Sequence, residues 1–106
     1  MSQLAAFGVT LAVELPWYVA GLVGLRLAGW WMALALGVVV NAVSHPLLWW
    51  WLAPHPTYAR LASAEAAVWL LETALLLAAI RRAPALLAVL SLAANASSLL
   101  IGLLLS

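Results

Sequence analysis

The 106-residue sequence contains no cysteine, and only 7% of its residues are charged. The absence of cysteine excludes disulfides, thiolate metal sites and cysteine nucleophiles, and it leaves soft metals such as Cu(I) without their preferred ligands. A net charge of +1 is too small to indicate nucleic-acid binding. Hydrophobic residues make up 69% of the chain and its mean hydropathy is +1.18. These values are typical of a compact polytopic membrane protein in contact with the lipid bilayer.

Three short breaks divide the sequence into four apolar segments, each close to the length of about 20 residues that a membrane-spanning helix needs. Helices are expected because backbone polar groups find no water partners in lipid. The fold class that follows is an all-α integral membrane protein with one four-helix domain over residues 1–106. Thr57 suits the N-cap of the third helix, and Pro84 suits the first turn of the fourth. The expected transmembrane helices are residues 4–25, 30–52, 58–80 and 84–105.

The arginines are unevenly distributed among the connections. Arg26, Arg81 and Arg82 lie in the first and third connections, whereas Arg60 follows the second. The positive-inside rule therefore places the first and third connections in the cytoplasm and both termini outside. Tryptophans at both ends of the second segment, residues 30–31 and 49–51, suit the two membrane interfaces. We expect a multi-pass protein of a bacterial inner membrane.

A polar pattern occurs twice in the chain. Glu14 is followed in the second segment by Asn41, and Glu72 is followed in the fourth by Asn95; these are the only asparagines. The pattern predicts two tandem helical hairpins, residues 1–52 and 58–105. Because each unit has two helices, both would run the same way through the membrane, with pseudo-twofold symmetry about its normal.

The repeated polar residues fall near the middle of their segments. Ser44 and Ser98 each follow an asparagine by three residues and share its helix face. Two carboxyls, two carboxamides and two hydroxyls should therefore occupy one layer near the bilayer centre. Pro16 and Pro46 should also free backbone carbonyls close to this layer.

His45 and Glu65 lie at equal depth on the second and third segments. We expect them to be joined by a hydrogen bond or ion pair and to form the entrance to the site. Trp17 and Trp69 each lie three residues from a central glutamate, so each indole is a candidate for a cation–π contact. Glu14, Glu72, His45 and Glu65 are also candidate ligands for a hard or borderline divalent cation, and no other cofactor is expected.

Glu14 and Glu72 have no arginine within side-chain reach on their own helices. A carboxylate at the bilayer centre costs on the order of 3 kcal/mol on insertion scales, so such groups usually mark pathways or proton relays. Two neighbouring carboxyls share a proton until a cation displaces it. The sequence therefore predicts a small transporter or channel for a divalent metal or organic cation, proton-coupled through Glu14 and Glu72, as a homodimer.

Two alternatives remain at this stage. Asn and Ser in membrane helices often serve only as interhelical hydrogen-bonding groups, so the chain is alternatively a structural or assembly subunit that binds partner membrane subunits. An enzyme is not expected, although an intramembrane metalloenzyme using His45, Glu65 and Glu72 is the second alternative.

Overall fold

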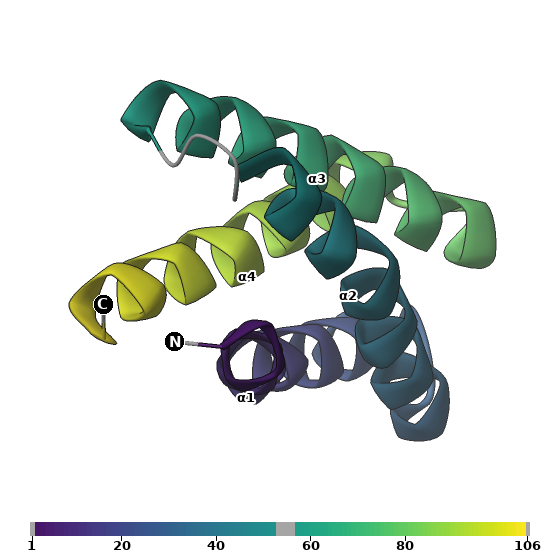
Figure 1. The fold of residues 1–106 in the computed structure, drawn as a ribbon. Helices are drawn as coiled ribbons and strands as arrows, with labels where there is room; N and C mark the ends of the chain where they lie inside the picture. Colours follow the sequence, from purple (N-terminus) through teal and green to yellow (C-terminus); the bar gives the residue numbers. More distant parts are fainter. Residues whose placement is uncertain (1, 53–56, 106) are drawn as a thin grey trace.

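The computed structural model describes residues 2–52 and 57–105, which form four long helices (Figure 1). All four are long and apolar enough to cross a membrane. The predicted all-α transmembrane fold is thereby confirmed, with three helices at their expected bounds and the first shifted by one residue. The helices are α1 (Gln3–Gly24), α2 (Trp30–Leu52), α3 (Tyr58–Ile80) and α4 (Pro84–Leu105).

The helix ends follow local chemistry. The hydroxyl of Ser2 accepts from the Ala5 N–H, so α1 begins at Gln3. Thr57 caps α3 in the same way by accepting from the Arg60 N–H, as expected. At the other end of α3, Arg81 takes a left-handed conformation with φ of 60° and stops the helix. The turn that follows leads directly into α4 at Pro84.

The helices pack as a closed ring, in which α1 contacts α2 and α4, and α3 also contacts α2 and α4. The diagonal pairs, α1 with α3 and α2 with α4, face each other across the centre. The first and third connections lie at one end of the bundle, where Arg82 Nη2 donates to the Arg26 carbonyl at 2.5 Å. The termini and the start of α3 lie at the other end (Figure 1). Each inward side chain near mid-depth therefore faces residues from all four helices.

The outer surface is apolar, as a lipid-facing surface requires. Large exposed side chains include Leu70, Val89 and Leu100. Trp30 and Trp31 at the start of α2, and Trp50 and Trp51 near its end, are also exposed. Their positions at the two ends of a bundle 39 Å long suit the interfaces of a bilayer whose hydrocarbon core is about 30 Å thick.

The half of the bundle next to the first and third connections is filled by packed apolar side chains. Leu22, Leu76 and Leu87 are completely buried in this cluster. Gly21 allows α1 to approach α4, because a Cβ at this position would collide with the side chain of Leu90. A Cβ at Gly24, in contrast, would meet no atom within 4 Å. This half therefore closes the centre of the bundle at one end.

Replacing Leu76 with alanine should lower the free energy of unfolding by about 2–4 kcal/mol, because the substitution leaves a void in the packed half. Unfolding of the purified protein in lipid bicelles measures the change. Leu70→Ala is the matched control on the same helix, since Leu70 is 61% exposed. Equal destabilisation by the two substitutions would contradict the described packing.

Candidate functional site

Glu72 is the most highly hydrogen-bonded side chain of the central layer, and it is 1% exposed. Its Oε1 accepts from the Tyr18 hydroxyl at 2.5 Å and from Asn95 Nδ2 at 3.2 Å. Its Oε2 accepts from the Ser44 hydroxyl at 2.5 Å. Donors from α1, α2 and α4 therefore converge on a carboxyl group of α3.

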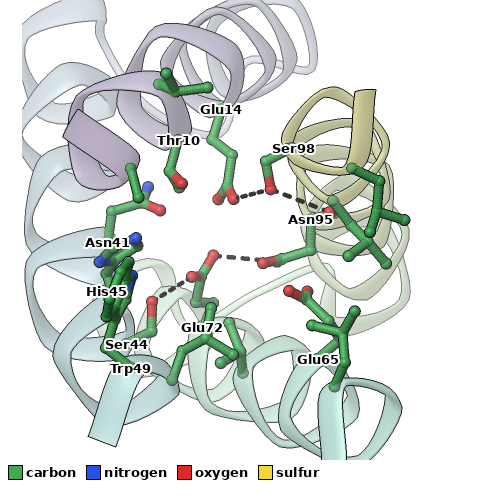
Figure 2. A pocket seen from close by; sticks show the side chains of 18 residues that line it. Thr10, Glu14, Asn41, Ser44, His45, Trp49, Glu65, Glu72, Asn95 and Ser98 are labelled. Atoms are coloured by element: carbon green, nitrogen blue, oxygen red, sulfur yellow. Dashed lines mark hydrogen bonds between the residues drawn. The ribbon is translucent and has the colours of Figure 1, made fainter. Parts of the chain in front are cut away.

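Glu14 lies opposite Glu72 with far fewer partners, although it is equally buried at 1% exposure (Figure 2). Its Oε2 accepts from the Ser98 hydroxyl at 2.6 Å, whereas its Oε1 is buried without a hydrogen-bond partner among the described residues. The Ser98 oxygen also lies 3.1 Å from the Asn95 carbonyl. The two carboxyl groups are close enough to interact electrostatically.

The two asparagines share one local geometry. Asn41 Nδ2 donates to the Gly37 carbonyl, and Asn95 Nδ2 donates to the Ser91 carbonyl, both four residues earlier and both at 2.8 Å. These bonds fix the orientation of each amide, because a flipped amide would place two oxygens against each other. Asn41 Oδ1 is buried without a described hydrogen-bond partner.

The serine contacts cross between the two hairpins. Ser44 of the first hairpin bonds Glu72 of the second, and Ser98 of the second bonds Glu14 of the first. The structure thus joins Glu14, Glu72, Ser44, Ser98 and Asn95 into one network, while Asn41 faces the same cavity (Figure 2). The local geometry matches in the two hairpins, and their pseudo-twofold relation stays a prediction.

A cavity of about 290 Å³ begins at this layer. Its walls come from the first halves of α1 and α3 and the second halves of α2 and α4, so it extends toward the end that holds the termini. Glu14, Asn41 and Glu72 lie at its inner end, next to the packed apolar half. The bundle is therefore hollow on one side of its central layer and filled on the other.

His45 and Glu65 both line this cavity, but on different walls (Figure 2). Within residues 2–52 and 57–105 no hydrogen bond or ion pair joins them, so the expected direct contact is wrong. The His45 ring instead packs on Phe7, with ring centroids 5.2 Å apart, and lies 6.3 Å from the Trp49 ring. Equal depth on adjacent helices does not bring two side chains together when their helix faces diverge across a cavity.

Trp17 and Trp69 are not among the residues that line the cavity. The Trp17 side chain is 43% exposed on the outer surface, and the Trp69 indole N–H donates to the Ala88 carbonyl on α4 at 2.8 Å. The indole on the cavity wall is that of Trp49, which the sequence suggested only as an interface residue. Residues three apart lie about 60° from each other around a helix axis, so the spacing gives the general direction of a side chain but does not ensure that a large ring reaches the site.

Pro16 and Pro46 do not open backbone oxygens toward the site. Both prolines are exposed, as are Ala12 and Ala42, whose carbonyls they leave free. Pro16 lies two residues after Glu14, or about 200° around the helix, and therefore on the opposite face. The carbonyls freed by the prolines therefore belong to exposed residues on the lipid-facing side of their helices and do not face the polar layer.

Sequence reasoning missed Tyr18 and Ser91, both completely buried beside Glu72. Their oxygens lie 3.3 Å apart on the side of the layer away from the cavity. Tyr18 follows Glu14 by four residues and so shares its face, which is the signal that marks it. A tyrosine hydroxyl buried in a membrane helix needs a partner, and here that partner is Glu72.

The acidic and histidine residues are too dispersed for a protein-only metal centre. Across residues 2–52 and 57–105, no three His, Asp or Glu side chains come close enough together to hold a metal ion. The four candidate ligands Glu14, Glu72, His45 and Glu65 line one cavity without converging on one point. Two oxygen ligands from Glu14 and Glu72 leave most of the coordination of a divalent cation unfilled.

Tyr18→Phe should lower the free energy of unfolding by about 1–3 kcal/mol, because Glu72 loses one of its donors in a low-dielectric environment. Unfolding in lipid bicelles measures the change. Tyr58→Phe is the matched control, because Tyr58 is 84% exposed. A Tyr18→Phe protein as stable as this control would show that the hydroxyl contact contributes nothing.

The one-sided opening predicts which positions react with a water-soluble thiol reagent, and the cysteine-free chain makes single substitutions simple to read. Gly102→Cys on the cavity wall should be labelled by a membrane-impermeant methanethiosulfonate, whereas Ala94→Cys in the packed half should not. Leu100→Cys, on the lipid-facing side of the same helix, is the control for reaction within lipid. Equal labelling at positions 102 and 94 would contradict the described cavity.

Comparison of the chain with protein-family models, curated protein sequences and solved structures gives no match. The function is therefore inferred from the geometry of the chain's own residues.

Proposed function

We propose that this protein transports a monovalent organic cation across a membrane in exchange for protons. The observation that supports this function is the pair of buried carboxyl groups, Glu14 and Glu72, at the inner end of a cavity that extends to one end of the bundle. A substrate entering from that end reaches the carboxyls at mid-depth and meets the packed apolar half beyond them. This is the arrangement of a transporter opened to one side only.

The charge of the carboxyls is not balanced by the chain's own cations. The arginines lie at or beyond the helix ends, and Arg60, Arg81 and Arg82 donate to backbone carbonyls there. Ionisation of both carboxyls without a counter-charge is costly at this depth, and their mutual repulsion adds to the cost. A proton or a cation in the cavity removes the cost, and only one of them is needed at a time.

The hydrogen bonds suggest different roles for the two acids. Three donors converge on Glu72, which suits an ionised carboxylate because that group only accepts hydrogen bonds. Glu14 has a single donor, Ser98, whose one hydrogen can point either to Glu14 or to the Asn95 carbonyl. Protonation of Glu14 therefore costs no hydrogen bond, since Ser98 can then accept from Glu14 and donate to Asn95. We assign the exchanging proton to Glu14.

The cavity walls favour an organic substrate over a metal ion. Besides the polar residues of the central layer, the walls include large apolar side chains that offer no ligand to a metal but pack well against an apolar body: Leu48, Trp49, Leu61, Val68 and Leu99. Glu65 lies on the wall between the opening and Glu72, and its carboxyl group, when ionised, attracts a cation inward.

The alternative role as an assembly subunit requires polar groups that face partner helices. Glu14, Asn41, Ser44, Glu72 and Asn95 are each at most 4% exposed and point into the chain's own bundle. They are therefore not available to bind helices of another subunit. Homodimer formation stays a prediction.

In proteoliposomes with an acidic interior, the parent protein should take up an organic cation such as benzylammonium, and Glu14→Gln and Glu72→Gln should each reduce the initial rate at least ten-fold. Glutamine keeps the size of the side chain but cannot exchange a proton. Uptake is followed with radiolabelled substrate, and proton movement with an internal pH dye.

Leu70→Ala on the lipid-facing surface serves as the control for reconstitution. Full uptake in both glutamine variants would reject the proposed site, and uptake in the parent without proton movement would reject the coupling.

A further inference from the structure

Two oxygen atoms at the inner end of the cavity are buried and accept no hydrogen bond from the part of the chain that the structure describes. They are Glu14 Oε1 and Asn41 Oδ1, and their residues are each 1% exposed. Both side chains line the same cavity from adjacent helices (Figure 2). Most buried polar atoms in proteins have partners, so two neighbouring exceptions need an explanation.

While Glu14 is ionised, both atoms are acceptors only, so neither can donate a hydrogen bond to the other. Asn41 cannot turn to offer its NH₂ group, because Nδ2 already donates to the Gly37 carbonyl at 2.8 Å. The second asparagine shows what a completed arrangement looks like, since Asn95 Nδ2 reaches both the Ser91 carbonyl and Glu72 Oε1. On the Glu14 side of the layer, Ser98 donates to Glu14 Oε2 and the Thr10 hydroxyl lines the cavity nearby (Figure 2), but no described donor reaches Glu14 Oε1 or Asn41 Oδ1.

We propose that Glu14 Oε1 and Asn41 Oδ1 bind two N–H groups of a protonated amine, and that Asn41 selects alkylammonium ions over quaternary ammonium ions. The inference rests on the proposed function and defines the substrate class of the same site. The carboxyl oxygen balances the charge of the ammonium group, and the amide oxygen takes a second hydrogen. The apolar part of the amine lies along Leu48, Trp49 and Leu99 toward the opening.

The same two oxygens explain how proton and substrate exclude each other. Without substrate, a proton on Glu14 neutralises its buried carboxyl group, so that no other positive charge is needed beside it. An entering ammonium ion supplies its own hydrogens to both oxygens, and the proton leaves Glu14 for water in the cavity. One positive charge arrives and one departs, so the net charge of the layer does not change.

A quaternary ammonium ion keeps the charge but has no N–H group. It leaves Asn41 Oδ1 buried and unpartnered, which predicts binding about ten- to one-hundred-fold weaker than that of the matching primary amine. Metal ions gain little at this position, because no third charged ligand stands beside Glu14 and Glu72 in the described part of the chain.

The test is a methylation series on one apolar body, measured by calorimetry with the full chain in lipid nanodiscs. The probes are benzylammonium, its N-methyl and N,N-dimethyl derivatives, and benzyltrimethylammonium. The parent should bind the primary and secondary amines best and the quaternary ion at least ten-fold more weakly. Asn41→Leu should remove this preference, whereas Ser97→Ala, outside the cavity lining, should retain it.

Equal affinity of the parent for primary and quaternary ions would overturn the inference, as would an unchanged preference in Asn41→Leu. Either result would leave cation transport through Glu14 and Glu72 standing. Absence of binding by every ion of the series, together with unchanged behaviour of Glu14→Gln, would instead reject the proposed function. If Asn41→Leu does not fold, the affinities of the parent protein for the four ions still test the inference.

Discussion

A carboxyl group buried at mid-membrane must obtain its hydrogen bonds from other helices, and the centre of this bundle is organised around that requirement. Glu72 is reached by Tyr18 from α1, Ser44 from α2 and Asn95 from α4. These contacts fix the relative rotation of all four helices, because turning any one of them removes a donor from a low-dielectric environment. The apolar packing on one side of the layer could tolerate such a rotation more easily, since Leu and Ala faces are alike all round the helices.

The difference between the two acids is as informative as their similarity. Each occupies a matching place in its hairpin, and each accepts from the serine of the other hairpin. Tyr18 and Ser91 complete the surroundings of Glu72. The position that corresponds to Tyr18 in the second hairpin is Leu76, and the position that corresponds to Ser91 in the first hairpin is Gly37, so neither offers a polar side chain to Glu14. One half of the polar layer is therefore satisfied from within the chain, and the other half is left open to a proton or a ligand from the cavity. A site that exchanges ligands needs this difference, because a layer whose polar atoms all had partners within the chain would have no atom left to bind a ligand.

The cavity lies on only one side of the polar layer, so the two ends of the bundle differ. Packed Leu22, Leu76 and Leu87 close one side, and the contact of Arg82 with the Arg26 carbonyl ties the two hairpins together at that end. At the other end the two hairpins are also in contact, because Arg60 Nη2 donates to the Trp51 carbonyl at 2.8 Å and Trp51 Nε1 donates to the Ser63 hydroxyl at 3.3 Å. The proposed transport would require the packed side to open in turn, and movement of one hairpin against the other about the central layer would achieve this.

The sequence alone determined the four helices, their bounds to within one residue, and the depth of the polar layer. Hydrophobic length and the position of a residue along a span are one-dimensional properties, so Glu14, Asn41, Ser44, Glu72, Asn95 and Ser98 were all found from spacing. Rotation about each helix axis was decided by the tertiary structure. Near-uniform apolar helices carry little periodic signal to indicate which face points inward. For that reason Trp17 and both prolines turned outward, Trp49 and Tyr18 turned inward, and His45 was separated from Glu65 by the cavity that they share.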